Sequence, residues 1–315
     1  MVISCSEVFD MKKLTVIIAL LLSCTLLTGA ITLAAEENST PIAENLEITT
    51  YRGVSVGGRL SASDPDGDAL SYQITTAPTK GSIDLDDDGH FVYTPADGKR
   101  GKDYFGYKAS DKEGNLSQEA TVIIRIEKQK SKVTYSDLDG KSCAYAAVRL
   151  AENNIFTGER YGNEYIFASE TPMTRSEFLA LCIEITGVDI NTNTLNTGFS
   201  DDDSIEVWAK PYVYLALKRG IISGYAENDV AVFEPQRQIS VAEAIVILDR
   251  AVQLTDAVAA WFSTEDAVPT WAAQSVANVA SCGILPHDCS VSGTTLSRAQ
   301  AAEMLSGAMD IINRR

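Results

Sequence analysis

The sequence predicts a multi-domain protein in which an all-β sandwich is followed by an all-α part. Short runs of alternating apolar and polar residues, separated by Gly- and Asp-rich turns, fill the stretch from about 45 to 127. Such spacing is typical of a β-sandwich. After residue 132, one helix–loop–helix pattern occurs three times, which is typical of helical repeats. A chain of 315 residues is long enough for two or three domains.

Residues 1–35 have the features of a secretory signal peptide. A basic pair precedes an apolar run of small residues that ends just before Glu36, and we expect cleavage near Ala35, with Ala30 as the alternative position. Two alternatives are a lipid on Cys24 and an uncleaved membrane anchor, because the run is just long enough to span a membrane. No later segment is as apolar, so we expect an exported protein with no transmembrane segment after cleavage.

The composition argues against several functions. The net charge of −17 does not suit a nucleic-acid partner, which needs a basic face. The two histidines, His90 and His287, lie beside no nucleophile motif, and the sequence has no Gly-rich phosphate loop and no His/Cys metal motif. We therefore expect no enzyme and no cofactor, apart from the calcium considered below.

The β-sandwich is expected at 45–127, between a polar lead-in at 36–44 and a polar linker at 128–132. Apolar residues alternate with polar ones within each expected strand, and turn residues separate the strands. The expected strands include 69–75, 90–94, 104–108 and 120–126.

Three units of similar length, at 133–190, 197–255 and 260–312, make up the rest of the chain. Each first helix is expected to end in a left-handed residue, which Asn and Gly tolerate, at Asn154, Gly220 and Gly283. Each second helix is expected to start with a capping box, formed by Thr174 with Glu177, Ser240 with Glu243, and Ser297 with Gln300. One helical hairpin cannot bury its own apolar face, so neighbouring units must pack together.

Four cysteines remain after removal of the signal peptide. An even number in an exported chain permits two disulfides. Cys282 with Cys289 is the simplest local pair, and Cys143 would then pair with Cys182 across two helices of one unit. Buried free thiols are the alternative.

Several motifs of the β-sandwich occur in a known family. They are Ser61–Tyr72, which contains Asp64-Pro65-Asp66-Gly67-Asp68, then Lys80–Ile83, Phe91–Pro95 and Gly101–Tyr107. With them the sandwich resembles the bacterial cadherin-like, immunoglobulin-type modules of surface proteins, which implies a spacer or an adhesion unit. Cadherin-type modules bind calcium between tandem copies through similar Asp clusters, so Asp64, Asp66 and Asp68 are weak candidate calcium ligands. An acidic turn is the alternative, because only one copy is present.

The helical units also carry motifs in a fixed order. These are Tyr135-Ser136-Asp137, Phe199-Ser200-Asp201 and Phe262-Ser263, then Trp208-Ala209 and Trp271-Ala272, Gly220–Tyr225, Phe233-Glu234-Pro235, and Thr174-Arg175-Ser176-Glu177. In this order the units resemble the S-layer homology (SLH) domain in triplicate. The resemblance implies a pseudo-three-fold helical bundle. In the family, grooves between the repeats hold a secondary cell-wall polysaccharide that often carries pyruvyl groups.

The resemblance further implies which residues bind. Arg175 and Arg298 occupy the family's Arg position, and Arg can hold a planar carboxylate with two hydrogen bonds. Val241 replaces this Arg in the second unit, where Arg237 or Arg250 could compensate. The other polysaccharide-binding candidates are Asp137, Asp201, Trp208, Trp271, Glu177 and Glu243.

Each of these candidates also has a structural interpretation. The Glu residues would serve as capping partners, the Asp residues as helix caps or turn residues, the Trp residues as packing anchors, and the Arg residues as surface groups in local ion pairs. Ser142 replaces Trp in the first unit and Gln300 replaces Glu in the third. We therefore expect one or two competent grooves rather than three.

The resemblances together predict an exported protein of the cell wall or S-layer. Its SLH part would bind the secondary cell-wall polysaccharide non-covalently, and the β-sandwich would act as a spacer or adhesion unit. Other surface or S-layer proteins are further expected partners. The alternative is an adhesion or calcium-dependent interaction protein whose SLH bundle is largely structural.

Overall fold

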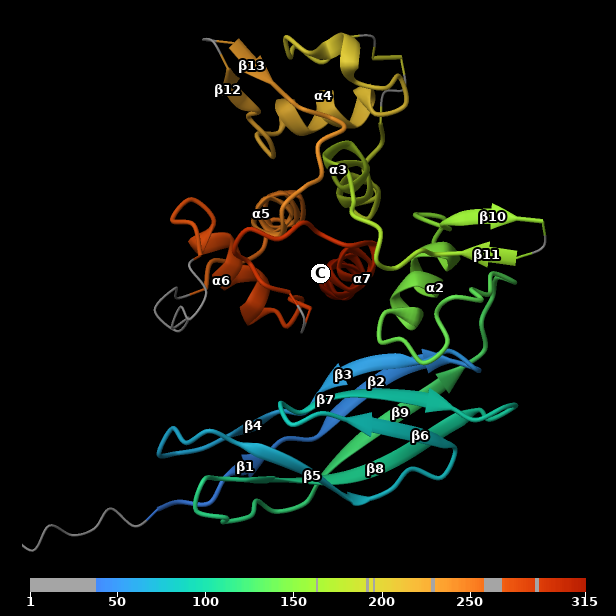
Figure 1. Ribbon diagram of the computed structural model, residues 1–315, viewed down its shortest axis with the longest axis vertical. Coiled ribbons are helices and arrows are strands. Elements are labelled where there is room, and N and C mark those ends of the chain that lie inside the picture. The colour runs from blue at the N-terminus through green and yellow to red at the C-terminus, as the bar shows by residue number, and fades with distance from the viewer. Residues whose placement is uncertain are drawn as a thin grey trace, which may run out of the picture. The chain divides into compact units, whose positions relative to one another are not determined.

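The computed structural model describes residues 38–162, 164–190, 193–194, 196–227, 230–257, 268–286 and 289–315. The predicted signal peptide at 1–35 lies outside these residues, as do Phe262, Ser263 and His287. Residues 40–315 form one compact unit, in which the strands of a β part come first along the chain and the helices follow (Figure 1).

Two sheets form the β part. One has the strand order β2-β9-β8-β5, with bounds Leu46–Tyr51, Ala120–Glu127, Gly101–Ser110 and Ser71–Thr76. The other has the order β3-β7-β6, with bounds Val56–Arg59, His90–Pro95 and Gly81–Leu85. A short separate pair joins β1 (Ile42–Ala43) to β4 (Ala62–Ser63). Strand β2 runs parallel to β9, and the other pairs are antiparallel.

Alternate residues of β7, β8 and β9 point into one shared core. Phe91 and Tyr93 of β7 and Phe105 and Tyr107 of β8 are among the largest fully buried side chains. Because side chains alternate between the two faces of a strand, the alternation in the sequence is also the alternation in burial. The four strands predicted from it are confirmed as β5, β7, β8 and β9.

Other strands of the β part were not predicted, and β3 shows why. Its sequence, Val-Gly-Gly-Arg, contains two glycines, and glycine is depleted in strands. A Cβ atom on Gly58 would lie 2.5 Å from the ring of Phe91, so this glycine allows strand and ring to approach. The requirement comes from tertiary packing and leaves no alternating pattern in the sequence.

Six helices of the helical part fall into two sets. The first helices of the units are α2 (Ala144–Glu152), α4 (Lys210–Lys218) and α6 (Ala273–Ser281), and the second helices are α3 (Arg175–Glu184), α5 (Val241–Val252) and α7 (Arg298–Arg314). The second helices contact one another pairwise, while α4 packs on α3, α6 on α5 and α2 on α7 (Figure 1). Each first helix thus packs on the second helix of another unit. None of the described helices has the length and apolar character needed to cross a membrane.

Three residues that precede the second helices form a closed ring of backbone hydrogen bonds. The N–H of Met173 donates to the carbonyl of Leu296 (2.9 Å), that of Leu296 to Ile239 (2.9 Å), and that of Ile239 to Met173 (3.0 Å). All three side chains are buried. The ring holds the three helix starts together and joins the last unit to the first.

The predicted ends of the helices are confirmed. Thr174, Ser240 and Ser297 each form a complete capping box with the Glu or Gln three residues later. Asn154, Gly220 and Gly283, at the ends of the first helices, have φ angles of 57°, 69° and 67°. These local signals were strong because each depends on backbone groups within one helical turn.

The prediction of an all-α part is wrong in one respect. Two short antiparallel hairpins lie in segments that the sequence suggested were loops: β10 (Glu159–Tyr161) with β11 (Glu164–Ile166), and β12 (Tyr225–Glu227) with β13 (Val230–Val232). Strands of three residues are too short to show a period. The third unit has a shorter loop and, in its described residues, no such hairpin.

Candidate functional site

The two predicted arginines lie at the first position of a second helix, where that helix meets a loop of another unit. Backbone hydrogen bonds fix this arrangement in all three units. They run from Arg175 N to Arg237 O (2.9 Å), from Val241 N to Thr294 O (3.0 Å) and from Arg298 N to Thr171 O (2.9 Å). The side chain at this position is therefore held against the neighbouring unit.

Arg175 packs against aromatic side chains of the second unit. Its Cζ atom lies 4.7 Å from the centre of the Tyr225 ring and 5.2 Å from that of Phe233. Both distances are within the range of a cation–π interaction. Arg175 is only 5% exposed, so the expectation of a surface arginine is wrong. We call Arg175, Tyr225, Phe233, Arg237 and Glu243 the Arg175 cluster.

The guanidinium of Arg175 lacks a partner for its charge among the described residues. It makes no ion pair and donates no side-chain hydrogen bond within this part of the chain, and its Nε atom is buried without a partner. Burial lowers the pKa of Arg175. A buried charge without a counterion is unfavourable, whereas an anionic ligand would supply both charge and hydrogen-bond acceptors.

The neighbouring Arg237, in contrast, is neutralised. Its Nε donates to Glu234 (2.7 Å) and its Nη2 to Glu243 (2.7 Å), while its Cζ lies 4.8 Å from the Tyr225 ring. The Tyr225 hydroxyl donates to Glu243 as well. Burial opposes ionisation of Glu243, but the hydrogen bonds from Arg237 and Tyr225 outweigh it and lower its pKa to about 2. The Tyr225 ring is therefore in contact with two guanidinium groups: that of Arg237, which is paired, and that of Arg175, which is not.

Arg298 lies in a similar place, and its Nε is likewise buried without a hydrogen-bond partner among the described residues, but its charge is paired. Its Nη1 donates to the carbonyl of Phe167 (3.2 Å) and lies 3.5 Å from Oε1 of Glu159. Its Cζ is 5.5 Å from the centre of the Phe156 ring. The Tyr161 hydroxyl donates to Oε2 of Glu159 (2.6 Å) and, together with Arg298, lowers the pKa of Glu159. We call Arg298, Phe156, Glu159, Tyr161 and Phe167 the Arg298 cluster.

The second unit lacks a cation at the corresponding place. Val241 is fully buried. Arg250, one suggested replacement, donates to the carbonyl of Ile221 (3.3 Å), and Arg237, the other, belongs to the Arg175 cluster. Neither compensates for the missing arginine.

Asp137 and Asp201 hold the loops that follow the two hairpins. The carboxylate of Asp137 accepts hydrogen bonds from the N–H groups of Phe167 (3.0 Å) and Ala168 (2.7 Å). That of Asp201 accepts from Phe233 and Glu234, both at 2.8 Å. The structure thus agrees with their interpretation as turn residues. They position Phe167 and Phe233 in the two clusters.

The remaining candidates differ in their surroundings. Glu177 bonds to its capping partner Thr174 (2.9 Å), while Glu243 combines this role with the Arg237 pair. Trp208 and Trp271 are 49% and 59% exposed, so both lie at the surface rather than in the core. Tyr225 and Glu159, which distinguish the two clusters, were not among the predicted residues, because a three-residue strand gives no signal of its own.

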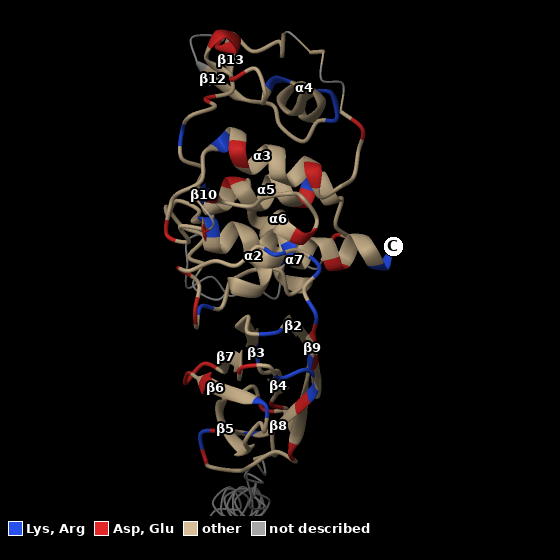
Figure 2. Cartoon of the chain, turned by 90° about the vertical axis from the view of Figure 1, so that its right-hand side faces the viewer, with Lys and Arg blue, Asp and Glu red and all other residues tan. Residues whose placement is uncertain are grey.

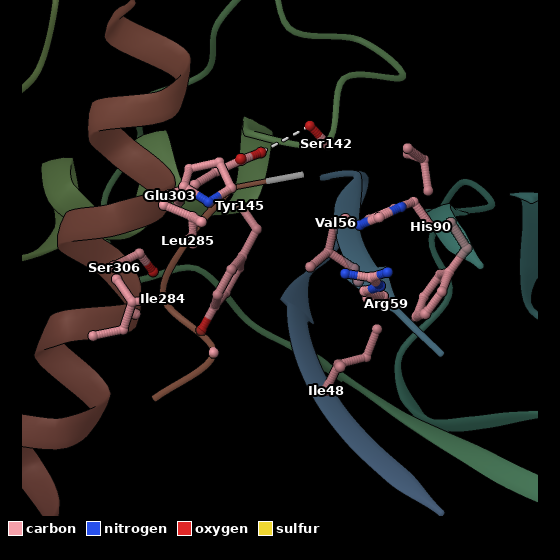
Figure 3. Close-up of a pocket in the computed structure, with 18 of the residues that line it drawn as sticks. Ile48, Val56, Arg59, His90, Ser142, Tyr145, Ile284, Leu285, Glu303 and Ser306 are labelled. Carbon is pink, nitrogen blue, oxygen red and sulfur yellow. Dashed lines mark hydrogen bonds between the residues drawn. The ribbon is translucent and has the colours of Figure 1, made fainter. Parts of the chain in front are cut away.

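Acidic and basic residues are spread over both parts of the chain rather than gathered on one basic face (Figure 2). A pocket of about 1090 Å³ is lined by residues of the β part and of the helices, where Ser142 donates to Glu303 (2.8 Å) (Figure 3). Ser142 replaces the expected Trp, and a Cβ on Gly57 would lie 2.7 Å from its Cβ. The small residue allows this close approach. The pocket contains none of the predicted binding residues.

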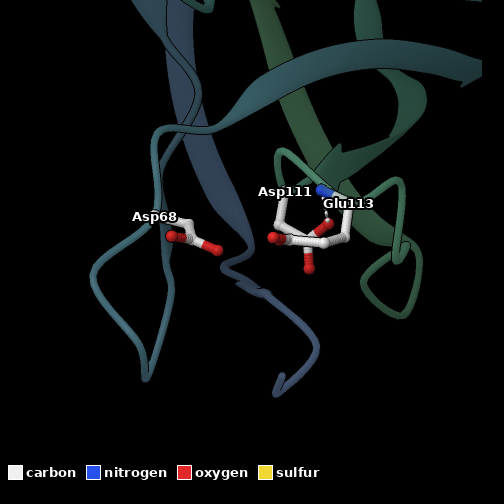
Figure 4. A group of neighbouring side chains, drawn as sticks. All are labelled: Asp68, Asp111 and Glu113. Carbon is white, nitrogen blue, oxygen red and sulfur yellow. Dashed lines mark hydrogen bonds between the residues drawn. The ribbon is translucent and has the colours of Figure 1, made fainter. Parts of the chain in front are cut away.

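The predicted calcium ligands form an acidic turn. Oδ1 of Asp64 accepts from the N–H groups of Asp66 (2.9 Å) and Asp68 (3.2 Å). Carboxylates of Asp68, Asp111 and Glu113 approach within 4.8 Å of one another (Figure 4). Asp66 is not in that group.

Lys112 supplies a positive charge to this acidic group. Its Nζ lies 2.7 Å from Oδ1 of Asp68, although Oδ2 of Asp64 and Oδ2 of Asp68 are buried without a hydrogen-bond partner. The oxygens suit calcium, but the ammonium group already lies where a cation would be attracted. The residues therefore fit calcium only in part.

Neither predicted disulfide is formed. Cys143, Cys182 and Cys289 are buried, Cys282 is exposed, and no disulfide joins them. Burial raises the pKa of Cys143 to about 12 and that of Cys182 well above its usual value. Cys143 caps α2, which packs on α7, whereas Cys182 belongs to α3, which packs on α4 and α5. The predicted disulfide between Cys143 and Cys182 assumed that the two helices of one unit pack together, but they pack on helices of other units.

Comparison with known proteins identifies two domains. Residues 38–128 match the bacterial cadherin-like domain and residues 198–245 the S-layer homology domain. The chain is 24% identical over 275 residues to an amylopullulanase of Thermoanaerobacterium thermosulfurigenes, covering 84% of this chain and 14% of that protein. It is 27% identical over 126 residues to the surface-layer 125 kDa protein of Lysinibacillus sphaericus, covering 40% of this chain and 10% of that one.

Among solved structures, the fibronectin(III)-like modules of Clostridium thermocellum CbhA are 15% identical, with a TM-score of 0.22, covering 30% of this chain and 51% of theirs. The chain spans only a small part of the length of the two curated relatives. The two matched domain types are non-catalytic. The SLH domain and the surface-layer relative indicate a protein of the cell surface or cell wall.

Proposed function

We propose that this protein is held non-covalently on the bacterial cell wall by three SLH repeats that bind an acidic, pyruvylated secondary cell-wall polysaccharide. The matched SLH domain at 198–245 lies within the second unit and covers most of it. The first and third units share its capping boxes, its left-handed helix ends and the closed ring of hydrogen bonds. These shared features support a pseudo-three-fold bundle at 133–190, 197–255 and 260–312.

One observation carries the proposed ligand class. Arg175 is buried, stacked on Tyr225 and Phe233, and has no counterion among the described residues. A carboxylate on a rigid ring would pair with the guanidinium through two hydrogen bonds. The aromatic rings would contact the apolar face of the sugar. Arg298 offers the same chemistry with a counterion already present.

The β part would then act as a spacer or adhesion unit outside the anchor, with other surface or S-layer proteins as partners. The test is co-sedimentation of residues 36–315 with purified cell walls, before and after acid extraction of the secondary polymer. We expect binding to intact walls and its loss after extraction. Equal binding to extracted walls would point to another wall component, and no binding to either would refute the anchor.

A second candidate function is calcium-dependent interaction through the β part. The group of Asp68, Asp111 and Glu113 favours it. Calcium titration of the same chain, followed by thermal unfolding and by binding to whole cells, tests it. Calcium-dependent cell binding that survives removal of the wall polymer would favour this function over the anchor.

A further inference from the structure

The two arginine clusters have the same cation but opposite neighbours at one position. Glu159 and Tyr225 each follow a glycine with positive φ, Gly158 at 65° and Gly224 at 75°, and each starts a hairpin. They are therefore equivalent residues of the first and second units. Tyr225 offers Arg175 an aromatic face, whereas Glu159 offers Arg298 a carboxylate.

The position of Glu159 is defined by two contacts. Oε1 lies 3.5 Å from Nη1 of Arg298, and Oε2 accepts a hydrogen bond from Tyr161 at 2.6 Å. The side chain of Glu159 is 53% exposed and that of Arg298 is 12% exposed. The carboxylate therefore lies on the solvent side of the guanidinium, where an incoming anion would have to approach.

The Arg175 cluster has no such carboxylate on its free cation. Its two acidic groups, Glu234 and Glu243, both bind Arg237. The charge of Arg175 thus remains available, while that of Arg298 is compensated. A carboxylate ligand would gain an ion pair at Arg175 and would face repulsion from Glu159 at Arg298.

We propose that Glu159 is a built-in counterion that keeps the Arg298 cluster from binding the acidic ligand, so that each chain binds one ligand, at Arg175. This inference rests on the proposed function. It adds a specificity-determining residue and a stoichiometry of one. The corresponding place in the second unit is occupied by the buried Val241, so it supplies no arginine for a further site.

The test is a calorimetric titration of residues 36–315 with a synthetic 4,6-pyruvylated methyl hexoside, with the unmodified methyl hexoside as the control ligand. We expect one site per wild-type chain. Glu159→Gln keeps a group that can accept the Tyr161 hydrogen bond and removes the charge, so we expect two sites. The second site should bind the ligand roughly tenfold or more tightly than in the wild type, since a charged hydrogen bond is gained.

Three further variants locate the gained site. Arg175→Met should abolish wild-type binding, and Arg175→Met with Glu159→Gln should regain one site that Arg298→Met then removes. Glu164→Gln, on the other strand of the same hairpin, changes charge equally without touching Arg298 and should leave one site. Thermal unfolding of each variant confirms that it folds.

The outcomes separate this inference from the function on which it rests. Two sites in the wild type, or no gain in Glu159→Gln, would overturn the role of Glu159 and leave polysaccharide binding standing. If neither the wild type nor Glu159→Gln bound the pyruvylated sugar, although both fold, the proposed ligand would be overturned as well.

Discussion

The guanidinium of Arg175 lies 4.7 Å from the centre of the Tyr225 ring. The hydroxyl of Tyr225 donates a hydrogen bond to the carboxylate of Glu243, which is paired with another arginine, Arg237. The Tyr225 ring is therefore contacted by two guanidinium groups, of which Arg237 is compensated and Arg175, among the described residues, is not. Such a buried, unpaired cation is unfavourable for folding. At this meeting point of two units, the proposed acidic ligand would supply the missing counterion.

The first prediction concerns stability without ligand. Arg175→Met removes an unpaired buried charge, so we expect the free energy of unfolding to rise by roughly 1 kcal/mol, after allowance for the lost cation–π contacts. Arg298→Met removes a paired charge and a hydrogen bond to Phe167, so we expect the free energy of unfolding to fall by roughly 1 kcal/mol. Urea unfolding measures both. If Arg175→Met lost as much stability as Arg298→Met, the guanidinium of Arg175 would not be unpaired in the folded protein.

The second prediction concerns Glu243 and acid. Its pKa of about 2 in the folded state lies below the ordinary value of about 4.3. The stability that the ionised Glu243 contributes to the folded state is therefore complete above a pH of about 4.5 and is lost as the pH falls towards 2. This contribution amounts to about 3 kcal/mol. Glu243→Gln should be less stable than wild type at pH 7, and the difference should shrink by pH 3.

The control for this experiment is Glu177→Gln. Both glutamates complete a capping box, and Gln300 shows that glutamine does so too, but the described bonds of Glu177 involve only Thr174. The difference in the free energy of unfolding between Glu177→Gln and wild type should therefore vary less with pH. Equal pH dependence in the two variants would show that the Arg237 pair is not the cause.

The third prediction concerns Lys112. Removing its ammonium group leaves the carboxylates of Asp68, Asp111 and Glu113 without a nearby cation. We expect Lys112→Gln to lower the melting temperature in calcium-free buffer and excess calcium to restore it, with little calcium effect on wild type. Lys128→Gln, at an exposed position outside this group, is the control. A variant that melts like wild type without calcium would show that the ion pair does not stabilise the turn.

The fourth prediction follows from the cysteines. Cys282 is exposed while Cys143, Cys182 and Cys289 are buried. Iodoacetamide should label Cys282 in the folded protein and all four only after unfolding. Mass spectrometry of peptides measures this. Unlabelled Cys282 in unfolded, unreduced protein would instead indicate a disulfide.

The sequence was a good guide where a feature depends on neighbouring residues. The capping boxes at Thr174, Ser240 and Ser297 lie within one helical turn, and the strand alternation in β9 lies within eight residues. Both were predicted. The arginine positions were found through the repeat pattern, but their burial was not.

The features that were missed depend on contacts between distant residues. Arg175 is buried by a hairpin some fifty residues away, whose strands are too short to show a period. Glu159 acquires its role only because α7 places Arg298 beside it. The disulfide pairing failed because helices of one unit pack on helices of other units. No local pattern records such partners.

The ring formed by Met173, Ile239 and Leu296 makes the native packing of the first unit depend on the third. Helix α2 packs on α7, so the first unit cannot complete its packing before the third unit has been synthesised. Until then, the apolar face of α2 lacks its native partner. The first unit therefore stays open, and able to pass through a narrow channel, until α7 is available. Chains truncated before Ser297 should accordingly be digested by protease between 133 and 190, and protection there would contradict this dependence.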